Sequence, residues 1–183
     1  MTIQKIIGAA LLFMGMANAC AEEVYADIPT KQASELVTKY TLADTKEKKV
    51  VQDKLNCLSK HNPNNNNVIR AYSSILISEG DYSEAVSLLN RYNAKNNDSS
   101  LKLQECMLKE RTGEHDTLCY KHVISLVEGK GIKDTDYLMA LFFTDDKRFT
   151  KEKEGYIART GFERDLDIFN KSKSEVLQIF YPN

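Results

Sequence analysis

Two glycines that lie 33 residues apart constrain the fold most strongly. Gly80 separates segments 68–78 and 83–92, in which apolar side chains recur every three or four residues. Gly113 lies between two further segments of the same kind. This spacing is the period of an amphipathic α-helix, and the period-two alternation of a half-buried strand is nearly absent from the chain. The sequence therefore predicts an all-α fold built from helical hairpins.

The same periodicity extends on both sides of these two hairpins. Asp44 precedes one apolar-periodic segment and Asp134 or Thr135 precedes another, and each residue type is a favoured helix N-cap. The asparagine run 64–67 is expected to be a linker and cap, because asparagine side chains compete for backbone groups. The predicted helical segments are 33–40, 44–58, 68–78, 83–92, 101–110, 117–127, 137–143, 149–158, 165–169 and 174–181.

The segment Gly80-Asp81-Tyr82-Ser83-Glu84-Ala85 resembles the turn and second-helix start of tetratricopeptide repeats, a family that includes the shorter Sel1-like relatives. In that family the glycine permits the turn, the aromatic side chain packs, and the alanine lets the two helices approach. The resemblance covers residues 66–98 well and 99–130 loosely. Tyr92, Asn97 and Leu118 depart from the small residue, the proline and the alanine that the family prefers there.

The resemblance implies antiparallel hairpins stacked as a short TPR-like solenoid. The last two helical segments, 165–169 and 174–181, are expected to cap the open end of the stack, as repeat arrays require. In such a stack the first helix of each hairpin lines a groove that binds another protein. The groove residues implied in this way are Asn67, Arg70, Ser74, Ile77, Ser100, Leu103, Met107 and Glu110.

The N-terminus has the three-part pattern of a cleavable secretory signal. Lys5 gives a short charged start, 6–16 is an uncharged apolar run, and Ala17-Asn18-Ala19 supplies a small–x–small cleavage site. The apolar run is shorter than the roughly 20 residues that cross a bilayer. We therefore predict a signal peptide at 1–19, a linker at 20–29, a single helical domain at 30–183, and a periplasmic or secreted location.

Cys20 leaves two fates open for the mature N-terminus. Bacterial lipoproteins are cut before a cysteine that then carries lipid, and Ala19 suits such a site. Ala17, however, stands where these sites usually have leucine. Cys20 is therefore either an ordinary residue of a soluble chain or a lipid anchor, and a membrane is expected as a partner only if Cys20 is lipidated.

The other cysteines suggest disulfide bonds, because an exported chain meets an oxidising compartment. Cys106 and Cys119 are equidistant from the turn at Thr112-Gly113, so they lie level with each other in an antiparallel hairpin. The sequence predicts that these two are bonded. Cys57 then pairs with Cys20 or has no partner.

No catalytic or metal-binding motif is recognisable. His115, Cys119 and His122 share one helix face, but the predicted bond to Cys106 already uses Cys119 and no fourth ligand follows. The net charge of −1 provides no basic face for nucleic acid. We therefore expect neither an enzyme nor a cofactor nor a nucleic-acid partner.

These observations favour a protein that acts by binding. The first hypothesis is a periplasmic protein-binding module, in its sharper form an immunity protein that neutralises a periplasm-acting toxin. The alternative is a lipid-anchored structural or assembly factor of a cell-envelope complex. Both name a protein as the partner, either a toxin or an envelope component.

Overall fold

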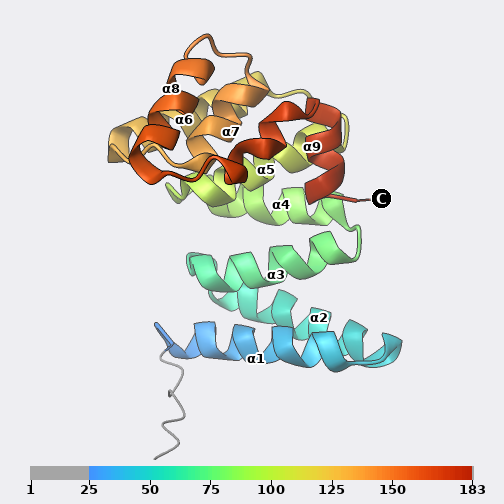
Figure 1. The fold of residues 1–183 in the computed structure, drawn as a ribbon. Coiled ribbons are helices and arrows are strands. Elements are labelled where there is room, and N and C mark those ends of the chain that lie inside the picture. The colour runs from blue at the N-terminus through green and yellow to red at the C-terminus, as the bar shows by residue number, and fades with distance from the viewer. Residues whose placement is uncertain (1–24, 183) are drawn as a thin grey trace, which may run out of the picture.

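The structure, a computed structural model, describes residues 25–182, so the predicted signal peptide and Cys20 lie outside the described residues (Figure 1). The described part is all-helical, and no strand occurs in it. Its elements are α1 (Ile28–Leu42), α2 (Thr45–His61), α3 (Asn66–Ser78), α4 (Tyr82–Asn93), α5 (Ser99–Arg111), α6 (Thr117–Lys130), α7 (Thr135–Phe143), α8 (Phe149–Thr160), the 3-10 helix η1 (Arg164–Asn170) and α9 (Lys173–Phe180).

Short polar side chains set the starts of most helices. Asp44 accepts hydrogen bonds from the backbone N–H groups of the first turn of α2, and Asp134 accepts one from Tyr137. Asn65, within the asparagine run, caps α3 in the same way. Helix α1 begins at Ile28, two residues before the expected domain start, because Pro29 suits the first turn of a helix.

The two glycine turns have the same backbone conformation. Gly80 and Gly113 adopt left-handed φ angles of 76° and 90°. In each turn the N–H after the glycine donates back across the helix end, from Asp81 to Leu76 and from Glu114 to Lys109, both at 2.8 Å. This six-residue closure is the Schellman arrangement that glycine favours. The 33-residue spacing therefore corresponds to a repeated local structure.

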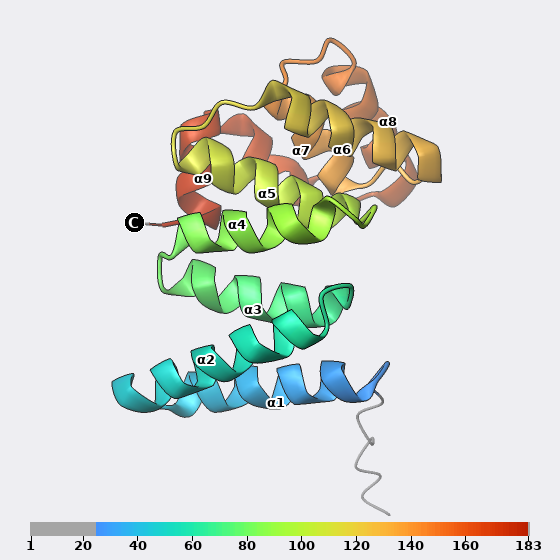
Figure 2. The ribbon, with the colours of Figure 1, turned by 180° about the vertical axis from the view of Figure 1, so that it is seen from behind.

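Consecutive helices pack against each other along the chain, from α1 to α8. Helices α1 and α2 both contact α3, and α4, α5, α6 and α7 follow in order. Figures 1 and 2 show the resulting stack from opposite sides, with α1 and α2 at one end and α8 at the other. Leucines, tyrosines and other apolar side chains form one buried cluster along it.

A disulfide and a buried carboxylate both join α5 to its neighbours. Cys106 and Cys119 form a disulfide between α5 and α6, with their Cα atoms 5.6 Å apart. Glu105 is fully buried between α4 and α5. Its carboxylate accepts hydrogen bonds from Asn90 and Asn93, at 3.1 and 2.9 Å, and pairs with two lysines of its own helix, Lys102 at 2.9 Å and Lys109 at 3.2 Å.

The C-terminal segment only partly follows the expected end cap. Phe169 of η1 packs with Phe142 and Phe149, at ring-centroid distances of 5.5 and 5.2 Å, and so covers the α7–α8 end. Helix α9 instead folds back onto α5 in the middle of the stack. Arg111 Nε donates to the carbonyl oxygen of the buried Tyr181 at 2.8 Å. The sequence did not predict the packing of α9 on α5, because that packing depends on contacts between residues far apart in the chain.

Candidate partner-binding grooves

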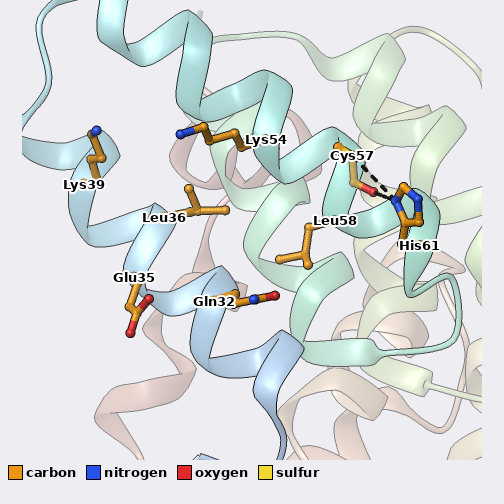
Figure 3. A pocket seen from close by; sticks show the side chains of 8 residues that line it. All are labelled: Gln32, Glu35, Leu36, Lys39, Lys54, Cys57, Leu58 and His61. Atoms are coloured by element: carbon orange, nitrogen blue, oxygen red, sulfur yellow. Dashed lines mark hydrogen bonds between the residues drawn. The ribbon is translucent and has the colours of Figure 1, made fainter.

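An open groove runs between α1 and α2 on the side of the hairpin that faces away from the rest of the stack. We call it the end groove (Figure 3). Leu36 and Leu58, both half-buried, point into it from the two helices. Polar and charged side chains surround them. The lining consists of Gln32, Glu35, Leu36 and Lys39 from α1 and of Lys54, Cys57, Leu58 and His61 from α2.

Further apolar side chains extend the groove face. Ile28 and Leu42 lie seven residues, or two helical turns, before and after the lining residue Glu35, and their side chains are 74% and 84% exposed. Val50 lies four residues before Lys54 on α2 and is 52% exposed. Because residues three, four or seven apart share one helix face, these side chains continue the groove lining. The outer face of the first hairpin is therefore more apolar than an end repeat normally shows to water.

Helix α8 forms the opposite end of the stack (Figure 1). Helix α8 carries the sequence Lys151-Glu152-Lys153-Glu154 and has no buried residue. Lys133, in the connection between α6 and α7, forms an ion pair with Glu152 of α8 at 2.5 Å. A charged outer face of this kind is what a terminal repeat needs for solubility. Beside α8, Ile132 and Phe162 are 68% and 60% exposed, so the α1–α2 end is distinguished by its open groove with apolar side chains inside it, and not by a lack of charge.

Cys57 and His61 lie together at one end of the end groove. Cys57 is exposed and has no disulfide partner within residues 25–182. Its Sγ lies 3.6 Å from His61 Nδ1, which also lies 2.8 Å from the Cys57 carbonyl oxygen (Figure 3). The expected alternative, a Cys20–Cys57 bond, involves a residue outside the described part. The groove therefore offers a thiol that solvent reaches directly.

The four groove residues predicted on α3 lie along the face toward α1 and α5. Asn67 Nδ2 donates to Thr30 Oγ1 of α1 at 3.3 Å, and Arg70 Nη1 donates to Ser100 Oγ of α5 at 3.4 Å. Ser74 is exposed, whereas Ile77 is half-buried against the core. Two of these side chains thus already bridge neighbouring first helices.

The residues predicted on α5 are less available. Leu103 and Met107 are 6% and 4% exposed, so little of their surface is accessible to a partner. They share one hollow with Ile168, Phe169, Phe180 and Tyr181 of the C-terminal segment, which covers this face. Glu110 is occupied too, since its carboxylate contacts His115 Nδ1 at 2.6 Å.

Among the described residues that line this covered hollow, Asp136 is the acidic one. Burial raises its pKa, and the nearby carboxylate of Asp134 adds to the effect. Arg70 and Ser100 lower that pKa in part. Asp136 therefore lies in a place that favours its neutral form more than water does.

Sequence reasoning missed both the end groove and Glu105. The groove could have been found from the spacing of Ile28, Leu42 and Val50, which place apolar groups on one outer face. Glu105 lies among apolar residues in the sequence, so its pairing was not predicted. Lys102 and Lys109, three residues before it and four after it on the same helix, are the signal that could have indicated this pairing. Its burial and pairing make it a structural group that joins α4 to α5.

Two kinds of site were not found among the described residues, a membrane-spanning helix and a metal-binding cluster. Between residues 25 and 182, no helix is both long and apolar enough to cross a bilayer. No cluster of three or more histidine, cysteine, aspartate or glutamate side chains in that range is arranged to hold a metal ion.

Comparisons with known proteins found no family model, no curated protein and no solved structure that matches this chain. The class that the fold itself defines is an all-α stack of helical hairpins.

Proposed function

We propose that this chain is a non-enzymatic module that binds another protein in the periplasm, and that the partner docks on the end groove. The observation that carries the proposal is the open groove between α1 and α2. It leaves the half-buried Leu36 and Leu58 accessible, and Val50 is exposed on the same helix as Leu58. Apolar faces of this kind are typical of interaction sites.

The geometry of the hairpin suggests which kind of segment the partner supplies. Helix α3 packs on both α1 and α2 from the inner side. The end groove presents the same two helices from the outer side, so an amphipathic helix of the partner continues the stack there. Glu35, Lys39 and Lys54 at the groove edge provide charges of both signs for its polar flanks.

Cys57 allows a direct test of this docking site. In a Cys20→Ser background, a bulky maleimide on Cys57 is expected to abolish capture of the partner from a periplasmic extract. The matched control carries Cys57→Ser and Thr150→Cys, which places the same label on exposed α8 at the other end. Equal capture by both labelled proteins would rule out the end groove.

The sharper form of the proposal is an immunity protein that occludes a toxin delivered to the periplasm. Occlusion needs only tight binding, which fits a module with no recognisable catalytic motif. A strain that lacks this chain is expected to lose resistance to its siblings in a competition assay, and a groove-blocking variant should not restore it. Unchanged resistance in the deletion strain would exclude this role while leaving the docking site open.

The alternative is a lipid-anchored assembly factor. Cys57 is exposed, so it is accessible to Cys20 in a soluble chain and keeps a free thiol if Cys20 carries lipid. Intact mass spectrometry of the protein from cells decides between the two. An acyl addition at Cys20 supports the anchored factor, whereas an unmodified N-terminus supports a diffusing binder.

A further inference from the structure

We propose that a second groove, which we call the basic groove, binds an acidic peptide segment that carries one apolar side chain. The basic groove lies where the C-terminal ends of α2 and α4 meet the start of α3. It is independent of the end groove, and no residue lines both. Its lining consists of Ser59, Lys60, Pro63, Asn64, Ile69, Leu88, Asn90, Arg91, Tyr92, Ala94 and Lys95.

The floor of the basic groove is apolar and rigidly held. Ile69, Leu88 and Tyr92 are 2%, 4% and 5% exposed, and all three belong to the buried core. A side chain that enters the groove therefore meets fixed apolar surface, which is the usual construction of a binding pocket. This floor accounts for the apolar side chain in the proposed ligand.

The rim of the groove is positively charged. Lys60, Arg91 and Lys95 line it, and none of the described residues that line it is an aspartate or a glutamate. Within residues 25–182, neither Lys60 nor Lys95 makes an ion pair, and Arg91 has only a long one to Glu84, at 3.8 Å, between two half-exposed side chains. Three cations around an apolar floor attract an anion because the low-dielectric surface weakens their screening.

Stabilisation of helix ends explains only part of this charge. Lys60 and Arg91 lie in the last turns of α2 and α4, where a cation also interacts with the helix dipole. Lys95 lies two residues beyond the end of α4 and adds a third cation to the groove lining.

Two connecting loops form one wall of the groove. The asparagine-rich connection between α2 and α3 lies beside the connection between α4 and α5 (Figure 2). Asn96 Nδ2 donates to Asn64 Oδ1 at 3.5 Å and so links them. Asn64 Nδ2 and Asn90 Oδ1 can then meet the backbone of an extended segment, since Asn64 Oδ1 accepts from Asn96 and Asn90 Nδ2 donates to Glu105. The asparagine run thus gains a part in binding in addition to its capping of α3.

A peptide fits these features better than a nucleic acid does. Single-stranded nucleic acids bind through a long basic track and exposed aromatic rings on which bases stack. Here Tyr92, the aromatic residue among the described residues that line the groove, is buried, and the chain as a whole has a net charge of −1. Local positive charge over an apolar floor suits an acidic segment with one apolar anchor.

The experiment measures fluorescence anisotropy of a labelled peptide with four glutamates around one leucine. The purified protein is expected to bind it, and the double variant Lys60→Glu with Lys95→Glu should bind about tenfold more weakly. The affinity should also fall as salt is raised to about 1 M, where the Debye length is only about 3 Å. Replacing the leucine by serine should weaken binding, because the floor then gains no contact.

The matched control is Lys46→Glu with Lys151→Glu, which changes the net charge equally at two exposed lysines outside the groove. This pair should retain the affinity of the wild type. Because all four lysines are exposed on helices or turns, circular dichroism should show both variants folded. Absence of peptide binding, an equal loss in both pairs, or equally tight binding of a basic peptide or of a single-stranded oligonucleotide would overturn the proposal.

Discussion

Cys106 of α5 and Cys119 of α6 are bonded across the Gly113 turn, although 13 residues separate them in the chain. Such a short loop stabilises by at most about 3 kcal/mol in the loop-closure model. We expect the double variant Cys106→Ala with Cys119→Ala to lower the free energy of unfolding by about that amount, measured in urea. Adding a reductant should destabilise the wild type and leave the double variant unchanged.

Cys57 serves as the control for this experiment. It is exposed and unpaired within the described residues, so Cys57→Ser should leave the urea midpoint in place. If reduction does not shift the midpoint of Cys57→Ser, the bond contributes nothing measurable to stability.

The buried carboxylate of Glu105 is the second element that joins α5 to a neighbour. Glu105→Gln keeps the shape and removes the charge that Lys102 and Lys109 neutralise. Breaking a buried pair by removing one partner typically costs about 3–5 kcal/mol. Because both lysines are slightly exposed, we expect a loss of about 3 kcal/mol. Glu84→Gln, at a half-exposed pair, should change stability by less than about 0.5 kcal/mol.

Acid should destabilise the protein through Glu105 and Asp146. Burial alone would raise the pKa of Glu105, but hydrogen bonds from Lys102, Asn93 and Asn90 outweigh it and hold that pKa below its ordinary value. Hydrogen bonds from Arg148 lower the pKa of Asp146 to about 2. A carboxyl group whose pKa is lowered on folding stabilises the protein above its unfolded pKa, and this contribution is lost as pH falls through the folded pKa.

Urea midpoints should therefore stay level from neutral pH down to about pH 5 and then fall between about pH 4 and pH 2. Asp146→Asn should start from a lower stability and show a shallower fall in this window. A midpoint that rises on acidification, or an equally steep fall in the variant, would contradict this assignment.

Local signals in the sequence predicted most of the helices. Asp44 and Asp134 cap the helices that they were expected to cap, and Gly80 and Gly113 make the two equivalent turns. These features depend on residues within one turn of each other. They locate elements to within a few residues but do not say which faces meet.

The faces depend on contacts between residues far apart in the chain, which no local pattern encodes. Leu103 and Met107 have the spacing of a groove lining and are buried because a segment more than 60 residues later covers them. In contrast, Leu36 and Leu58 look like ordinary core residues, yet nothing within residues 25–182 covers their outer side. Composition and spacing therefore predicted the stack but not which of its surfaces are free.

The docking of α9 on α5 gives the last prediction. Tyr181 is buried, its carbonyl oxygen accepts from Arg111 Nε, and the Tyr82 hydroxyl donates to the neighbouring carbonyl oxygen of Pro182. Tyr181→Ala is therefore expected to cost about 3–5 kcal/mol of unfolding free energy, as for other buried aromatic side chains. Phe180→Ala, at a side chain that is 48% exposed, is the matched control and should cost clearly less.

Hydrogen exchange separates local undocking from global destabilisation. If α9 covers the α5 face, Tyr181→Ala should increase exchange in α5 and α9 more than in α1 and α2, and an apolar dye should bind to the uncovered Leu103 and Met107. Equal exchange in all helices would mean that Tyr181 supports the whole stack. Unchanged stability and exchange would show that α9 does not cover α5 in solution, and the groove predicted there from the sequence would then be open to a partner.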